Sequence, residues 1–274
     1  MEFILYILAG LAVGFAVGLT GVGGGSLMTP LLLLFGYPAP VAIGTDLLYA
    51  GLTKTTGVYF HQRKGNIRWR IMILLVLGSI PVSLGLNLFV MDADFRENEN
   101  YEALLTMILG VMLILTSLVI IFQKRIQRRI SENSGQDTHS HDIDASPMGF
   151  ARKHTDIFTV LTGMLLGLCV TLSSVGAGAF GAAVLFVLYP RLKVTHIVGT
   201  DIAHAVPLTL VAGLGYLYYG LVDFILLFVL LCGSLPGIYL GTHMGSVMPE
   251  KLMRYLLAIT LLGLGIKFSF LSGH

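Results

Sequence analysis

The hexapeptide TGVGGG, residues 20–25, breaks an apolar stretch that otherwise runs from residue 3 to residue 36. A helix needs about 20 apolar residues to cross a hydrocarbon core of about 30 Å. The glycines leave two shorter apolar segments, 3–19 and 26–36. Non-helical backbone at membrane depth is tolerated only where protein covers it or where it lines a cavity. The stretch therefore predicts a helix pair that is broken within the membrane, with the break inside the protein.

The rest of the chain has the same apolar character. A second pair of short apolar segments, 157–172 and 179–190, flanks another glycine-containing break, SSVGAG at residues 173–178. Only 12% of the 274 residues are charged, about half of the roughly 25% that is usual in soluble proteins. We therefore predict an all-α polytopic membrane protein. The segments that are about long enough to cross the membrane are 39–60, 71–91, 101–122, 194–219, 222–243 and 252–271.

The two halves of the sequence repeat each other at an offset of 155 residues. Glycines of the two breaks and several polar motifs superpose at this offset without a gap. Such coincidences at one offset indicate an internal duplication, which is typical of secondary transporters that bind their substrate at the repeat interface. The superposed motifs include Gly44-Thr45-Asp46 on Gly199-Thr200-Asp201, Gly78-Ser79 on Gly233-Ser234, and Pro81 on Pro236.

We predict a first transmembrane repeat at 1–122, a polar linker at 123–155 and a second repeat at 156–274. Each repeat has one broken helix pair and three transmembrane helices. Basic residues at 61–70 and 123–129 predict that these two segments are cytoplasmic. In the second repeat the cations flank different turns, which favours an inverted second repeat whose broken pair enters and leaves on one side. A parallel arrangement remains the alternative.

Each break is a candidate anion site. A helix that begins within the membrane presents unpaired N–H groups and the positive end of its dipole, and glycine allows a ligand to approach the backbone closely. Alternatively, the glycines only permit tight helix packing and a hairpin turn. The candidate substrate-binding residues are Thr20, Gly21, Val22, Gly23, Gly24, Gly25, Ser26 and Thr45 in the first repeat, and Ser173, Ser174, Gly176, Ala177, Gly178 and Thr200 in the second.

Asp46 and Asp201 each lie about seven residues into an apolar helix, where a carboxylate is costly and therefore functional by default. His204 follows Asp201 by three residues, on the same helix face. Three roles stay open for the aspartates: structural support of the break, proton coupling, and direct cation binding. We do not expect direct contact with an anionic substrate, because two ionised carboxylates would repel it.

Lys54 lies fifteen residues into the segment 39–60. It could neutralise an anion in transit, but it is close enough to the cytoplasmic end for its ammonium group to snorkel to the surface. We expect snorkelling, and therefore only a modest loss of affinity when Lys54 is replaced by methionine.

The motifs resemble those of the sulfite exporter TauE/SafE family of bacterial permeases. The resemblance rests on GLTGVGGG at 18–25 followed by PLL at 30–32, on AIGTD at 42–46 with Lys54, and on VGTD at 198–201. It covers nearly the whole chain apart from the linker. It implies a permease of the bacterial inner membrane for a small anion, a sulfur oxyanion or organosulfonate, with no cofactor and no metal. The sequence leaves a homodimer open, and it has no basic stripe that would indicate a nucleic-acid partner.

Two other function classes remain as alternatives. An intramembrane hydrolase would pair Ser26, Ser173 or Ser174 with His204, although neither a G-x-S-x-G elbow nor a His-Glu-x-x-His motif is present. A scaffold with a transporter-like fold would not move solute at all. We expect no enzymatic activity, and solute flux in liposomes separates a transporter from both alternatives.

Overall fold

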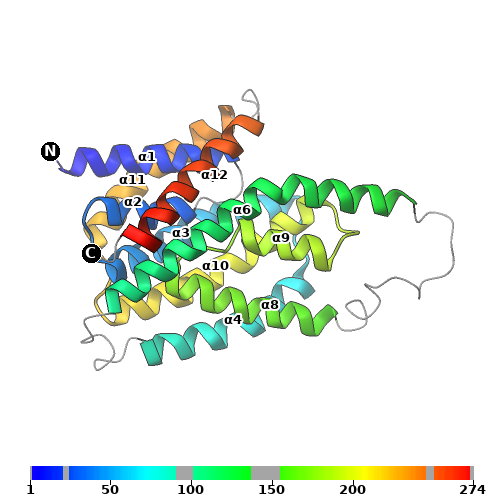
Figure 1. Ribbon diagram of the computed structural model, residues 1–274, viewed down its shortest axis with the longest axis horizontal. Coiled ribbons are helices and arrows are strands. Elements are labelled where there is room, and N and C mark those ends of the chain that lie inside the picture. Colours follow the sequence, from blue (N-terminus) through cyan, green and yellow to red (C-terminus); the bar gives the residue numbers. More distant parts are fainter. Residues whose placement is uncertain (1, 21–24, 91–100, 137–154, 245–249, 272–274) are drawn as a thin grey trace.

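The computed structural model describes residues 2–20, 25–90, 101–136, 155–244 and 250–271, without the side chains at several helix ends. Every regular element within these ranges is helical (Figure 1), so the all-α fold class is confirmed. The elements are α1 (Glu2–Thr20), α2 (Gly25–Leu34), α3 (Ala39–Arg63), α4 (Trp69–Val90), α6 (Tyr101–Gln136), α8 (Thr155–Ser173), α9 (Ala179–Leu188), α10 (Val194–Tyr218), α11 (Phe224–Met244), α12 (Glu250–Ile266) and the π-helical turn η2 (Lys267–Leu271).

Both predicted broken pairs are present, as α1 with α2 and α8 with α9. In each pair the chain turns back on itself. The Tyr6 ring at the start of α1 lies 5.5 Å from the Phe35 ring that follows α2. Thr159 Oγ1 near the start of α8 lies 2.7 Å from the hydroxyl of Tyr189, which follows α9. Each broken pair therefore enters and leaves on the same side of the protein.

The repeat is visible in the helix boundaries, because α3 and α10 both have 25 residues and both of their ends differ by 155. These equivalent helices run antiparallel. The N–H of Asp223, after the end of α10, donates to Thr45 Oγ1 near the start of α3 (3.1 Å). The N–H of Arg68, after the end of α3, donates to Thr200 Oγ1 near the start of α10 (2.9 Å). The repeats are therefore inverted relative to each other, as the loop charges favoured.

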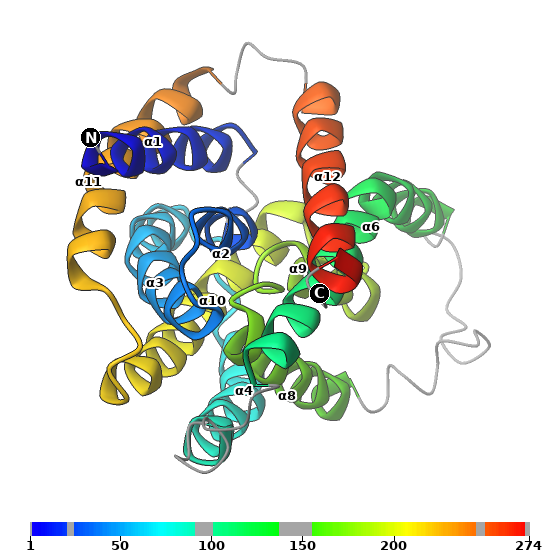
Figure 2. The ribbon, with the colours of Figure 1, turned by 60° about the vertical axis from the view of Figure 1, so that its left-hand side comes forward.

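The most extensive contacts between helices are those between helices of different repeats. The first repeat's α1 packs along α11, and the second repeat's α8 packs along α4 in the equivalent way, with α3 and α10 between the two pairs (Figure 2). Glycines make the approach close: a Cβ at Gly14 would overlap the backbone of Ser234, and a Cβ at Gly78 would overlap that of Val160. Small residues allow such backbone contact between membrane helices. The duplicated units of sequence are thus interlocked in the fold.

The end of one helix and the set of helices that could cross the membrane differ from expectation. Helix α6 continues past the apolar segment to Gln136, so the first part of the predicted polar linker is helical. Five of the described helices are long and apolar enough to cross a membrane. They include α8, which we expected to be too short, but not α3 or α12. Helix α3 is long enough at 25 residues, but its middle carries the polar residues of the candidate site.

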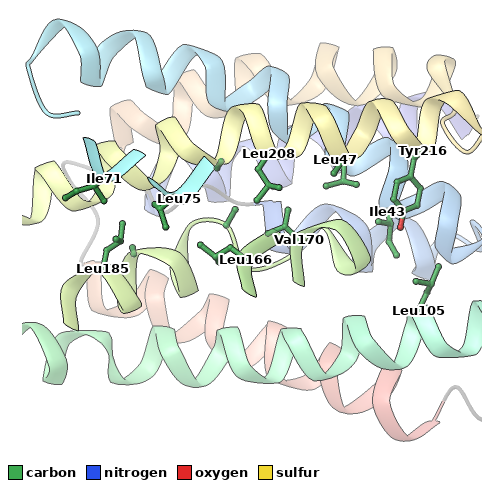
Figure 3. Close-up of a cluster of buried hydrophobic side chains, with 14 of the residues drawn as sticks. Ile43, Leu47, Ile71, Leu75, Leu105, Leu166, Val170, Leu185, Leu208 and Tyr216 are labelled. Carbon is green, nitrogen blue, oxygen red and sulfur yellow. The ribbon is translucent and has the colours of Figure 1, made fainter. Parts of the chain in front are cut away.

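The second break lies inside the protein. Ser173 and the five residues after it are all buried, and Ala177 belongs to a core that includes Leu166 and Val170 of α8 and Leu208 of α10 (Figure 3). This is the burial that a break at membrane depth requires. Residues 21–24 of the first break lie outside the described ranges.

Candidate functional site

The second break is a tight, hydrogen-bonded turn. Ser174, Gly176 and Gly178 have φ angles of 57°, 118° and 128°, a region that L-residues other than glycine rarely adopt. Ser173 stabilises the turn, because its hydroxyl donates to the carbonyl of Cys169 (2.6 Å) and accepts the N–H of Val175 (3.2 Å). The hydroxyl of Ser174 is buried and has no hydrogen-bond partner. Ser173 therefore shapes the break, whereas the Ser174 hydroxyl is not part of the hydrogen bonds that hold the turn.

Lys54 does not snorkel, so that expectation was wrong. Only 7% of Lys54 is exposed, and its Nζ donates to the carbonyl oxygen of Ala177 in the second break (3.2 Å). The α8–α9 turn frees this carbonyl from helical bonding, and the antiparallel packing of α3 against α10 brings Lys54 to it. One repeat thus places a buried cation on the broken helix of the other repeat.

Asp46 connects the two broken pairs. Its Oδ2 accepts hydrogen bonds from the N–H (3.2 Å) and the hydroxyl of Thr29 in α2. Its Oδ1 has no partner, and the Ser174 side chain of the second break lies close enough to interact with the carboxyl group. Asp46 is fully buried. Its position supports both the structural role and a role in coupling.

Asp201 lies against the first turn of α9. Its carboxyl group interacts with the backbone N–H of Gly178, and a Cβ added to Gly181 would collide with it. Its Oδ1 has no hydrogen-bond partner. Lys54 interacts electrostatically with both aspartates, and the interaction with Asp201 is the larger. The positive end of the α9 dipole therefore already has a carboxyl group of its own repeat beside it. The sequence had suggested that this helix end is free to bind an anion.

His204 forms a pair that sequence reasoning missed. Its Nε2 lies 2.9 Å from the hydroxyl of Ser79 in α4, and its Nδ1 has no partner. In the other repeat, Tyr49 and Ser234 occupy the equivalent positions at the 155-residue offset and also face each other. The superposition of Ser79 on Ser234 was the signal that could have identified this pair.

The remaining candidate residues separate into two groups. The Thr45 hydroxyl accepts a backbone N–H of the loop after α10, and the Thr200 hydroxyl accepts one of the loop after α3. Both hydroxyls are therefore already hydrogen-bonded to the backbone. The side chains of Thr20 and Ser26 and residues Gly21, Val22, Gly23 and Gly24 lie outside the described part of the chain; Gly25 begins α2. The hydrolase pairing with Ser173 or Ser174 is not formed, because His204 bonds Ser79 instead.

The site combines one buried cation, two buried carboxyl groups and several polar atoms without partners. Among the described residues, Asp201 Oδ1 and His204 Nδ1 are buried without a hydrogen-bond partner, and so are Asp46 Oδ1, Ser174 Oγ and the Tyr49 hydroxyl, although Ser174 lies near Asp46 and Ser234 near Tyr49. Most buried polar atoms in proteins are hydrogen-bonded, so each exception requires an explanation. A polar solute, water or a proton that visits the site would provide their partners.

Comparison with known proteins supports a transport role. The family model described as "Sulfite exporter TauE/SafE" matches residues 6–268. The probable membrane transporter protein YjnA of Bacillus subtilis (strain 168) is 36% identical over 262 residues, which cover 95% of this chain and 97% of that protein. YdhB of the same strain, also named a probable membrane transporter, is 28% identical over 261 residues, covering 93% and 96%. No solved structure matches the chain significantly.

Proposed function

This chain belongs to the sulfite exporter TauE/SafE family of membrane proteins, and from this premise we propose that it moves a small anion across the membrane. The substrate class that we propose is a sulfur oxyanion or organosulfonate, as the family description suggests. The substrate site is the interface of the two inverted repeats, where the second break meets α3 and α10.

The observation that carries this proposal is the position of Lys54. A lysine buried to this degree is rare unless it is paired, and here its ammonium group contacts a broken helix at the repeat interface. An anion that replaces the Ala177 carbonyl as its partner would form an ion pair with the ammonium group, and the attraction between two opposite charges is much stronger in a dry site than in water. The Ser174 hydroxyl, three residues before Ala177 in the same break, is a second donor that an anion could engage.

Within the described part of the chain, the Ser79–His204 pair is the observation that favours an enzyme, and its surroundings argue against one. A catalytic histidine needs a group that orients its second nitrogen, whereas His204 Nδ1 has no partner. The equivalent position in the other repeat is Tyr49, which is a poor general base. A symmetric pair of this kind supports solute movement through two related half-sites better than one-sided hydrolysis.

We assign the loop 64–68 to the cytoplasmic side of the inner membrane. Arg70 at the start of α4 forms an ion pair with Asp156 at the start of α8 (2.6 Å). His196 Nδ1 lies 3.3 Å from the carbonyl of Asn66. These contacts bring the basic loop, the end of the linker and the turn with Arg191 and Lys193 to one side of the protein. Because cytoplasmic loops carry an excess of lysine and arginine, we assign this side to the cytoplasm.

Flux measurements in proteoliposomes test the function. Wild-type protein should move sulfite and methanesulfonate, and should not move choline or glycerol. Lys54→Met should lower anion affinity by about two orders of magnitude, because loss of a buried charged partner costs about 3 kcal/mol. Lys64→Met removes an exposed lysine of the adjacent loop and serves as the matched control. Absence of anion flux in the wild type, or equal affinity in the two variants, would overturn the proposal.

A further inference from the structure

The candidate site has more negative than positive groups, which is unfavourable for binding an anion. Lys54 interacts electrostatically with two carboxyl groups, Asp46 and Asp201, so the cluster has a net negative charge when both are ionised. Such a site would repel the anion whose transport is proposed above, since charges in a dry site interact far more strongly than in water. A cation must therefore enter with the anion and neutralise one carboxylate.

The geometry favours a proton over a metal cation. A sodium ion would need several oxygen ligands around one position, and the ammonium group of Lys54, which donates to the freed carbonyl of Ala177, already interacts electrostatically with both carboxyl groups. A second fixed cation there would meet strong like-charge repulsion. A proton needs no such space, because it binds to a carboxylate oxygen directly.

The two aspartates are not equivalent, although the duplication places them at matching positions. Oδ2 of Asp46 accepts two hydrogen bonds from Thr29, and donors of this kind favour the ionised form of a carboxyl group. Asp201 interacts with one such donor, the backbone N–H of Gly178, but no side-chain donor is bonded to it in the described part of the chain; its Oδ1 is unpaired, and its charged partner is Lys54. Asp201 is therefore the carboxylate that is free to accept a proton.

The other groups around Asp201 are compatible with this role. Helix α9 presents Gly181 and helix α8 presents Leu166 at this point, so neither adds a charge. Helix α3 contributes Lys54, which also interacts with Asp46 and His204. His204 lies about one turn beyond Asp201 on α10, with Ser79 of α4 on one ring nitrogen and nothing on the other.

We infer that Asp201 is the proton-binding residue of an anion–proton symporter, and that its protonation releases Lys54 to bind the anion. The Asp201 carboxylate takes up one proton and becomes a neutral acid. Lys54 then has one carboxylate partner instead of two, and its ammonium group and the Ser174 hydroxyl are available to the anion. On the other side the anion leaves, Asp201 releases its proton, and the Lys54–Asp201 interaction forms again. One monovalent anion and one proton move together in each cycle.

The inference rests on the proposed function, and proteoliposomes test it with methanesulfonate, whose charge stays constant over the pH range of the assay. An inward proton gradient should drive accumulation of labelled methanesulfonate, up to about tenfold for each pH unit at one proton per anion. A sodium gradient at equal pH should drive none. A pH-sensitive dye inside the vesicles should report acidification that depends on the presence of the anion.

Variants assign the proton to its residue. Asp201→Asn mimics the protonated state, so it should still exchange labelled for unlabelled methanesulfonate but lose accumulation driven by the pH gradient. Asp46→Asn should lose affinity or stability while any remaining flux still responds to the gradient. Asp156→Asn, at an exposed aspartate, should behave as the wild type.

Three results would overturn the inference: accumulation driven by sodium, pH-driven accumulation in Asp201→Asn, or a folded Asp201→Asn that no longer exchanges anion. Anion flux that ignores the pH gradient would also overturn the inference, while the proposed anion transport would stand. Absence of anion flux in the wild type under every gradient would remove the proposed function itself.

Discussion

Replacing Gly181 with alanine tests whether the Asp201 carboxyl group must lie against the first turn of α9. An added Cβ would lie 3.1 Å from Asp201 Cγ and nearer still to Oδ1, whereas carbon atoms in contact are about 3.5–4.0 Å apart. The carboxyl group would therefore move by roughly 1 Å. Overpacking of this kind costs about 1–3 kcal/mol, and the better helix propensity of alanine offsets about 1 kcal/mol.

Function should suffer more than stability in this variant. We expect a net loss of about 0–2 kcal/mol in the free energy of unfolding. Anion flux should fall by about a hundredfold, the order of loss that a 1 Å displacement causes in a preorganised site. Thermal unfolding in detergent and flux in proteoliposomes measure the two effects on the same preparation.

Gly85→Ala is the control, because nothing lies within 4 Å of a Cβ added there. It should keep wild-type flux and gain up to about 1 kcal/mol of stability. If Gly181→Ala transports as well as Gly85→Ala, the position of Asp201 beside α9 has no role in transport.

Two further substitutions separate structural residues from the site. Thr200→Val removes the hydroxyl that accepts the N–H of Arg68, so it should cost about 1 kcal/mol of unfolding free energy and leave anion affinity unchanged; a loss of affinity as large as that of Lys54→Met would place Thr200 in the site. Gly163→Ala puts a Cβ onto the carbonyl of Leu75 in α4 and should destabilise the protein by about 1–3 kcal/mol in thermal unfolding. Gly263→Ala has open space around its Cβ and is the control, and equal stability of these two variants would contradict the close packing of α8 on α4.

The broken helix pairs and the duplication could be derived from the sequence because their causes are local. The length of an apolar run decides whether a helix can cross the membrane, and clustered glycines mark where it stops. The match of Gly44-Thr45-Asp46 with Gly199-Thr200-Asp201 needs no structure to be seen. The loop cations favoured inverted over parallel repeats, and the antiparallel contacts of α3 with α10 bear the inversion out.

The partners of the site residues depended on tertiary structure. Lys54 contacts Ala177, which is 123 residues away in the chain, and no local pattern distinguishes a lysine that faces a broken helix from one that extends toward the surface. Ser79 and His204 are 125 residues apart, and their pairing depends on how α4 crosses α10.

The sequence by itself thus determined the fold class, the two breaks and the buried position of Asp46 and Asp201, because hydrophobic length and glycine content act within one segment. Only the tertiary structure decided that Thr29 donates to Asp46, and that Lys54 interacts more strongly with Asp201 than with Asp46. The physical reason is that the charge balance of a buried carboxylate is set by donors and cations on other helices. Identical motifs in the two repeats therefore acquire different electrostatic surroundings when the repeats interlock.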